Sequence, residues 1–171
     1  MKKLYVPLIV SLFALSLIAC ASRPDWVSNP PTDGYHGMGM AQMDNEARAW
    51  QAATNRARQD LAYQLRTSVE NMQVDYGNVT GTSNGADFFS SVSRQLSDLV
   101  LSGAQVIKRG VGPNKTYYVL VSYPTEELRN AVISASQGEA ARNTEFQAEQ
   151  ALKAMDTELA KKRASAPRDY D

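Results

Sequence analysis

The stretch that decides the fold runs from Asp44 to Val69 and reads DNEARAWQAATNRARQDLAYQLRTSV. Its apolar residues recur at spacings of three and four, which predicts an amphipathic helix that Asp44 caps at its start. This stripe consists of Ala47, Trp50, Ala53, Ala57, Leu61 and Leu65. Because the stripe is rich in alanine, we expect the helix to approach a sheet closely. The other faces form either a binding patch or an ordinary solvated surface, and they carry Arg48, Arg56, Arg58, Asp60 and Arg66.

A glycine-rich segment precedes this helix, from Gly34 to Gln42 (GYHGMGMAQ), and its alternation predicts a first strand. One face of that strand carries Tyr35, Gly37, Gly39 and Ala41. Glycine inside a strand suggests that another element packs closely against it. Gly37-Met38-Gly39 lacks the third glycine of a nucleotide-binding fingerprint. His36, the only histidine, is either an ordinary strand residue or a ligand or base, and the sequence offers it no second His.

The segment after the long helix alternates in polarity from Ser68 to Tyr76 (SVENMQVDY), which predicts a half-buried second strand. A polar loop is then expected from Gly77 to Gly85. Helical spacing returns from Ala86 to Gly103, where Gly103 is a plausible helix stop. The apolar face of this second helix consists of Phe88, Phe89, Val92, Leu96, Leu99 and Val100.

A β-hairpin is predicted from Ala104 to Tyr123, because two strand-like runs flank the turn Gly112-Pro113-Asn114. The second run is apolar on both faces, so we expect it to be the central strand. The segment Pro124–Glu127 then opens a helix, with proline and carboxylates in its first turn. The predicted fold class is therefore α+β: a small antiparallel sheet packed by a long helix and a second helix, followed by a C-terminal helical extension.

The composition changes after Gly138 to residues that favour helices. Apolar residues are sparse in this part, and they are Ala148, Leu152, Met155 and Leu159. They cover barely two heptads, too few to indicate a coiled coil. The segment is either an exposed amphipathic helix that docks on a partner or a solvated, partly disordered extension.

Residues 1–19 have the order of a secretory signal peptide. Met1-Lys2-Lys3 is basic, Leu4–Ile18 is mostly apolar, and the small residue Ala19 precedes Cys20. The apolar run is about 15 residues long, whereas a helix needs roughly 20 to cross a membrane. An uncleaved anchor helix is the alternative.

Cys20, the only cysteine, ends the sequence LIAC (Leu17–Cys20), which resembles the bacterial lipobox. The resemblance implies that Cys20 Sγ receives a diacylglycerol thioether, that the leader is cut off before Cys20, and that the new α-amine is acylated. Two or three acyl chains hold a domain stably at a membrane, whereas one chain binds only marginally. Ala21-Ser22 follow instead of an aspartate, and by the same resemblance the destination is the outer membrane.

Composition and residue types give no sign of nucleic-acid binding or catalysis. The chain has 171 residues, with 18 basic and 18 acidic side chains, and lacks a basic nucleic-acid footprint. No spacing selects an acid–base pair from the candidate carboxylates, which are Asp60, Glu70, Asp75, Asp87 and Asp98. A zinc site lacks ligands. We therefore predict no catalytic residue, no metal and no cofactor; the alternative is a tethered periplasmic ligand-binding module or enzyme.

Four stretches carry a family resemblance, and they are PDWV (24–27), GYHGMGMA (34–41), ARAWQAATNRARQDLA (47–62) and YYVLVSY (117–123). Through them the chain resembles the Lpp-twenty family of bacterial outer-membrane lipoproteins, which includes a flagellar lipoprotein. The resemblance covers about residues 24–128. It implies a lipid-anchored α+β domain that performs no chemistry and acts as a structural or interaction component of the cell envelope, associated with flagellar structures in some members.

The expected organisation follows from these observations. Residues 1–19 are the signal peptide, and 20–33 are a lipidated tether that closes on the domain through Trp26 and Val27. The family-like domain covers 34–137, and the helical extension covers 138–171. The expected partners are the membrane, through the N-terminal lipid, and envelope proteins or further copies of the chain. Trp26, Tyr35 and Trp50 are expected to be packing residues.

Overall fold

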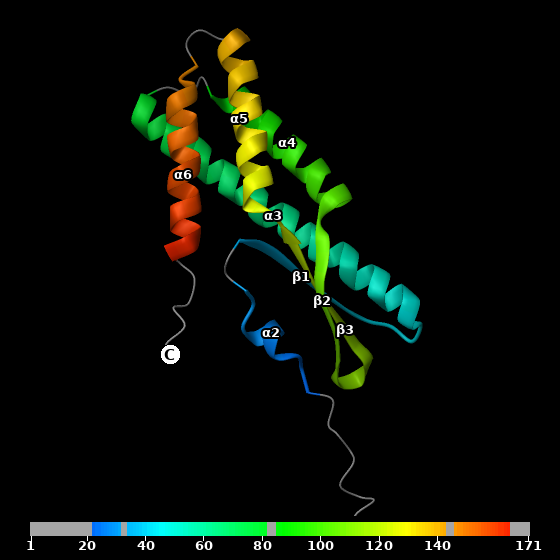
Figure 1. Cartoon of the computed structure of the whole chain (residues 1–171). Coiled ribbons are helices and arrows are strands. Elements are labelled where there is room, and N and C mark those ends of the chain that lie inside the picture. Colours follow the sequence, from blue (N-terminus) through cyan, green and yellow to red (C-terminus); the bar gives the residue numbers. More distant parts are fainter. Residues whose placement is uncertain (1–21, 32–33, 82–84, 143–145, 165–171) are drawn as a thin grey trace, which may run out of the picture.

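The computed structural model describes residues 22–31, 34–81, 85–142 and 146–164. The elements in chain order are α2 (Asp25–Ser28), β1 (Tyr35–Gln42), α3 (Glu46–Thr80), α4 (Ala86–Gly103), β2 (Gln105–Gly112), η2 (Pro113–Lys115), β3 (Thr116–Tyr123), α5 (Thr125–Arg142) and α6 (Ala148–Ala164). A three-stranded antiparallel sheet packs against helices, which confirms the predicted α+β class (Figure 1).

Helix α3 has 35 residues and is therefore about 52 Å long. Its N-cap is Asn45, whose side-chain oxygen accepts a hydrogen bond of 3.0 Å from Arg48 N, so the expectation that Asp44 caps the helix is wrong. The helix ends at Gly81, which has a left-handed φ of 67°. In Figure 1 the sheet lies against the N-terminal half of α3, and the other long helices gather around its C-terminal half.

The predicted strand at 68–76 is wrong, because α3 continues through it. The buried residues there are Ser68, Val69, Met72 and Tyr76, which follow the helical spacing of one, three and four. Over a run of nine residues, an alternating strand pattern and a helical stripe have several apolar positions in common. The segment is helical because later parts of the chain pack on the helical stripe and bury it. The loop expected at 77–85 begins only after Thr80. Ala47 is exposed, and Ala49 takes its place in the buried stripe.

The close packing predicted between the long helix and the glycines of β1 is confirmed. A Cβ atom built on Gly37 would lie 2.7 Å from the backbone nitrogen of Leu61 and closer still to the carbonyl oxygen of Ala57. A Cβ on Gly39 would meet the backbone at Ala53 and Ala57 in the same way. At Gly37 and Gly39 the helix therefore approaches the strand more closely than any larger residue at these two positions would allow.

The strand order is β1-β3-β2, so β3 is central, as predicted. β1 pairs with β3 from Tyr35↔Tyr123 to Gln42↔Thr116, and β2 pairs with β3 from Gln105↔Ser122 to Gly112↔Thr116. The predicted hairpin is confirmed, with η2 at its turn and a register shift between Val106 and Lys108.

The C-terminal half of α3 belongs to a core of aromatic side chains. The Tyr76 ring lies 5.6 Å from the Phe89 ring and 5.8 Å from the Phe146 ring, and the Phe88 and Phe146 ring centroids are 4.8 Å apart. Leu99, which was predicted on the buried face of α4, is 43% exposed.

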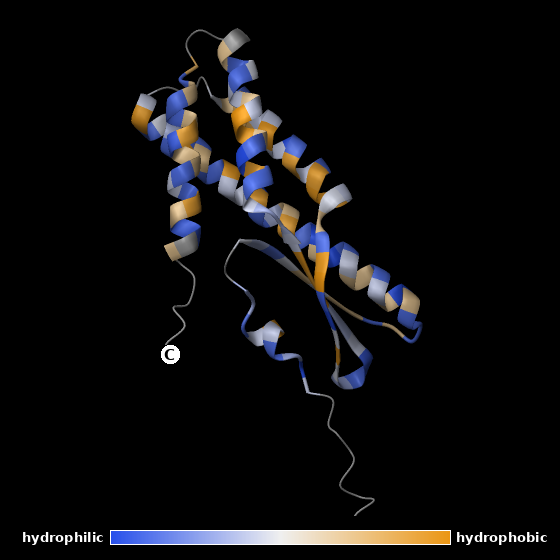
Figure 2. Cartoon of the chain, viewed as in Figure 1, coloured by the Kyte–Doolittle hydropathy of each residue, from blue (hydrophilic) through white to orange (hydrophobic). Residues whose placement is uncertain are grey.

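Helix α6 packs on α3 and α5, so neither sequence interpretation of the C-terminal segment describes it correctly. Its buried residues are Ala151, Ala154, Met155, Glu158 and Leu159. The boundary expected between residues 137 and 138 falls inside α5. Figure 2 shows that polar and apolar residues alternate around the turns of the helices. Among the described residues, no helix is both long enough and apolar enough to cross a membrane.

Candidate functional site

Cys20, the predicted lipidation residue, lies outside the described residues. The first element after it, α2, belongs to the segment that packs on the sheet. A Cβ atom built on Gly110 of β2 would lie 2.6 Å from Pro24 Cγ and 3.4 Å from Trp26 Cζ2. Val27 is buried and Trp26 is half-buried. The segment that follows Cys20 is thus fixed to the sheet by packing.

Three side chains of α3 hydrogen-bond the outer edge of β1. Gln64 Nε2 donates to His36 O at 2.9 Å, Asp60 Oδ2 accepts from Met38 N at 2.9 Å, and Arg56 Nη1 donates to Met40 O at 2.6 Å. Because Arg56, Asp60 and Gln64 are spaced by four, they form one row along the helix. An edge strand normally exposes unpaired backbone groups, and this row occupies three of those of β1, namely His36 O, Met38 N and Met40 O.

The sole histidine is on the face of β1 opposite α3. His36 is half-buried and pairs with Ser122 in the sheet register. The Asp60 carboxylate accepts hydrogen bonds from Met38 N at 2.9 Å and from Gln64 Nε2 at 3.1 Å. His36 therefore lies in the sheet, Asp60 bonds the edge strand from α3, and the row on α3 explains Arg56, one of the arginines considered as a binding patch.

A polar ladder joins α3 to α6. Lys162 Nζ donates to Gln64 Oε1 at 3.3 Å, and Asn71 Nδ2 donates to Glu158 Oε1 at 3.1 Å. Lys161 Nζ lies 2.7 Å from Asp75 Oδ2. Sequence reasoning missed these contacts because it placed the C-terminal segment outside the domain. The available signal was the spacing of four, three and four between Ala148, Leu152, Met155 and Leu159, which marks one face of a helix.

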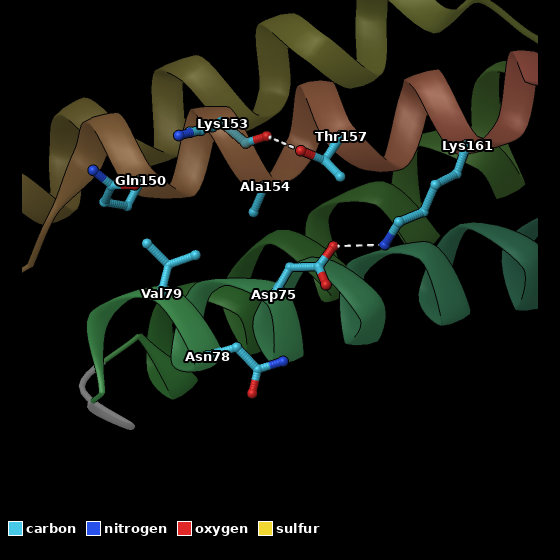
Figure 3. A pocket seen from close by; sticks show the side chains of 8 residues that line it. All are labelled: Asp75, Asn78, Val79, Gln150, Lys153, Ala154, Thr157 and Lys161. Carbon is cyan, nitrogen blue, oxygen red and sulfur yellow. Dashed lines mark hydrogen bonds and ion pairs between the residues drawn. The ribbon is translucent and has the colours of Figure 1, made fainter.

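Between these two helices, beyond the Lys161–Asp75 pair, lies a groove of about 290 Å³ (Figure 3). The groove is lined by Asp75, Asn78, Val79, Gln150, Lys153, Ala154, Thr157 and Lys161. Figure 3 shows Asp75 and Lys161 meeting across the gap, with Val79 facing α6.

The chemistry of this groove is limited by the ion pair. The hydrogen bond that Lys161 donates to Asp75 raises the pKa of Lys161, so that lysine stays charged and the Asp75 carboxylate offsets its charge. Asp75 is the only carboxylate among the lining residues, so the groove lacks two carboxylates for acid–base work. Lys153, on its rim, is exposed and supplies a second positive charge.

Two buried tyrosines have raised pKa values. Burial raises the pKa of Tyr35, against the effect of its 3.0 Å hydrogen bond to Ser68 Oγ. Burial also raises the pKa of Tyr123 to about 12, and the nearby Glu127 carboxylate adds to the rise. Both hydroxyls stay protonated at neutral pH. Tyr35 is confirmed as a core residue, with the Lys162 ammonium 5.0 Å from its ring centroid.

Trp50 lies half-buried beside the sheet and not in the central core. Its ring meets the Tyr117 ring edge-on at 4.8 Å, and its Nε1 donates to Glu46 Oε1 at 3.2 Å. The Arg109 guanidinium of β2 lies 5.7 Å from the Trp50 ring centroid, within cation–π range.

Within the described ranges, no three His, Cys, Asp or Glu side chains come close enough together to hold a metal ion. The sequence matches no protein-family model and no curated protein. The resemblance to the Lpp-twenty family, and everything it implies about location and partners, therefore stays a prediction.

Proposed function

We propose that this protein is a lipid-anchored lipoprotein of the bacterial outer membrane that acts as a structural or interaction component of the cell envelope. The observation that carries the proposal is the lipobox-like sequence LIAC ending at Cys20, after a run with the order of a signal peptide. Acyl chains on Cys20 hold the domain at the membrane. The domain itself performs no chemistry and works through contacts with other proteins.

The packing of Pro24 and Trp26 on β2 supports a short attachment. The chain from Cys20 to Pro24 spans at most about 14 Å, so a lipid on Cys20 keeps the sheet near the bilayer surface. Partners reach the domain within the layer next to the membrane. A flagellar role is the narrower form of the proposal.

The test is membrane fractionation of cells that grow with a tagged fatty acid. We expect the wild type to carry the label in the outer-membrane fraction and Cys20→Ser to carry none. Ser22→Ala is the matched control, because it changes a neighbouring residue and leaves the cysteine. Ala21→Asp is expected to move the labelled protein to the inner membrane. An unlabelled wild type in the soluble periplasmic fraction would sink the proposal, and normal swimming after gene deletion would remove the flagellar form alone.

The alternative function, a tethered ligand-binding module, rests on the groove between α3 and α6. A small anion held by Lys153 is the chemistry it favours. Calorimetric titration with inorganic phosphate, on wild type and Lys153→Glu, decides it: heat of binding that the substitution abolishes supports the module, and no heat removes it.

A further inference from the structure

The two edge strands of the sheet, β1 and β2, differ in whether side chains bond their outward backbone groups. On β1 the backbone groups of residues 36, 38 and 40 point outward, because they bond side chains of α3. Gly37 and Gly39 therefore bond β3 through Val121 and Val119, their partners in the register. Since direction alternates along a strand, Tyr118 and Leu120 direct their backbone groups toward β2.

The same alternation fixes the outer edge of β2. Gly110 and Lys108 pair with Tyr118 and Leu120, so their backbone groups point inward to β3. The N–H and C=O groups of Arg109 and Val111 therefore point away from the sheet. Within the part of the chain that the structure describes, β3 is the only strand that pairs with β2.

The side chains along this edge are apolar and basic. Ile107 is 44% exposed and Val111 is 46% exposed. Lys108 is exposed on one face of the strand, and Arg109 on the other face is held over Trp50. Each face of the strand therefore presents one positive side chain, which attracts carboxylates. Opposite charges placed directly across two strands stabilise the pairing of the strands.

We propose that the β2 edge binds an extended, acidic segment of a partner protein as a fourth, antiparallel strand. Two consecutive acidic residues of that segment lie opposite Arg109 and Lys108, and a β-branched residue lies opposite Val111. Backbone bonds to Arg109 and Val111 provide affinity, and the charges provide specificity. This proposal is independent of the lipid anchor proposed above. A chain that carries no lipid has the same β2 edge and is expected to bind the same segment.

A second copy of the chain fits this edge poorly. Antiparallel pairing of β2 with β2 of a second copy, centred on Arg109, would place the two Arg109 side chains opposite one another, which is unfavourable. Pairing of β2 with β1 of another copy is blocked, because Arg56, Asp60 and Gln64 occupy the β1 edge. The charges thus favour an acidic partner of different sequence.

The probe is a dye-labelled peptide, Thr-Val-Thr-Glu-Glu-Val-Thr, titrated against the full chain in mild detergent with fluorescence anisotropy as readout. The comparison peptide has two lysines in place of the two glutamates. We expect saturable binding of the acidic peptide alone. The variant that carries Lys108→Glu and Arg109→Glu should bind it about tenfold more weakly or worse. Arg94→Glu, a charge reversal of an exposed side chain in α4, is the matched control and should bind like wild type.

Val111→Pro tests the backbone part of the proposal. It removes an outward N–H and no bond of the sheet, and proline is tolerated at such edge positions. We expect it to melt like the wild type and to lose binding. If it unfolds, hydrogen exchange on the wild type decides instead: the peptide should slow exchange at Arg109 and Val111.

Three results of the peptide measurements overturn the proposal. They are no binding of the acidic peptide, equal binding of both peptides, and binding that leaves the exchange of Arg109 and Val111 unchanged. A dimer of the chain that Val111→Pro dissolves also overturns it, because a second copy would then occupy the edge.

Discussion

Replacing Gly37 with alanine tests whether contact between the β1 backbone and the α3 backbone holds the domain together. The new Cβ would lie 2.7 Å from Leu61 N, whereas ordinary contact begins at 3.4 Å, so the helix or the strand must move by at least about 0.7 Å. A gap of this size forfeits about a quarter to a half of each dispersion contact along the interface. Overpacking of a core costs about 1–3 kcal/mol, and more where rigid backbone must yield. We therefore expect Gly37→Ala to lower the free energy of unfolding by about 3 kcal/mol.

The assay is urea unfolding followed by far-UV circular dichroism, with the midpoint and slope compared with wild type. Gly138→Ala is the control, because a Cβ there meets nothing within 4 Å and the residue lies inside α5. We expect it to raise stability by up to about 1 kcal/mol, since alanine favours a helix more than glycine does. Ala57→Gly should not rescue Gly37→Ala, because the atom in conflict is the backbone oxygen of Ala57. A loss below about 0.5 kcal/mol for Gly37→Ala would refute the reasoning.

Three further predictions concern the core, the β1 edge and alkaline pH. Met155→Ala should cost about 2–5 kcal/mol in urea unfolding because Met155 is 1% exposed, whereas Lys153→Ala should cost almost nothing; equal small effects would mean that α6 is not part of the folded unit. Asp60→Ala should lower the free energy of unfolding by about 1–3 kcal/mol in the same assay, because Met38 N loses its hydrogen-bond acceptor. A variant as stable as the wild type would show that this hydrogen bond does not stabilise the β1 edge. Between pH 10 and 12 the unfolded chain has lost the Tyr123 proton that the folded chain keeps, so the free energy of unfolding should fall as pH rises through this window; Tyr123→Phe should reduce that fall, and an identical pH profile for the variant would exclude the assignment.

The sequence predicted the elements whose pattern is unambiguous over their whole length. The glycine face of β1, the buried stripe of α3 from Ala53 to Leu65 and the doubly apolar β3 each follow from residues within the element. The strand predicted at 68–76 failed because alternation over a short run does not exclude a helix, and the residues that cover this stretch come from later parts of the chain, such as Phe88 and Phe146.

The prediction that the C-terminal helix is exposed or solvated was wrong for a different physical reason. Ala151 and Ala154 add little to any hydrophobicity pattern, yet small residues let α6 lie close to α3. Glu158 counts as polar in a pattern, but it is 8% exposed and bonded to Asn71. The α3–α6 ladder and the open β2 edge depend on contacts between distant segments, which is why sequence reasoning found neither.

The order of the elements along the chain constrains how the domain folds. Strand β1 precedes its sheet partner β3 by two complete helices and by strand β2. Helix α3 follows β1 directly and offers it both a packing face and hydrogen-bond partners for its edge. Local contacts close faster than distant ones, so we expect β1 to dock on α3 before it pairs with β3. Pulsed hydrogen exchange should then protect the Met38 amide, which bonds Asp60, earlier than the Gly37 and Gly39 amides, which bond β3; the reverse order would show that the sheet forms first.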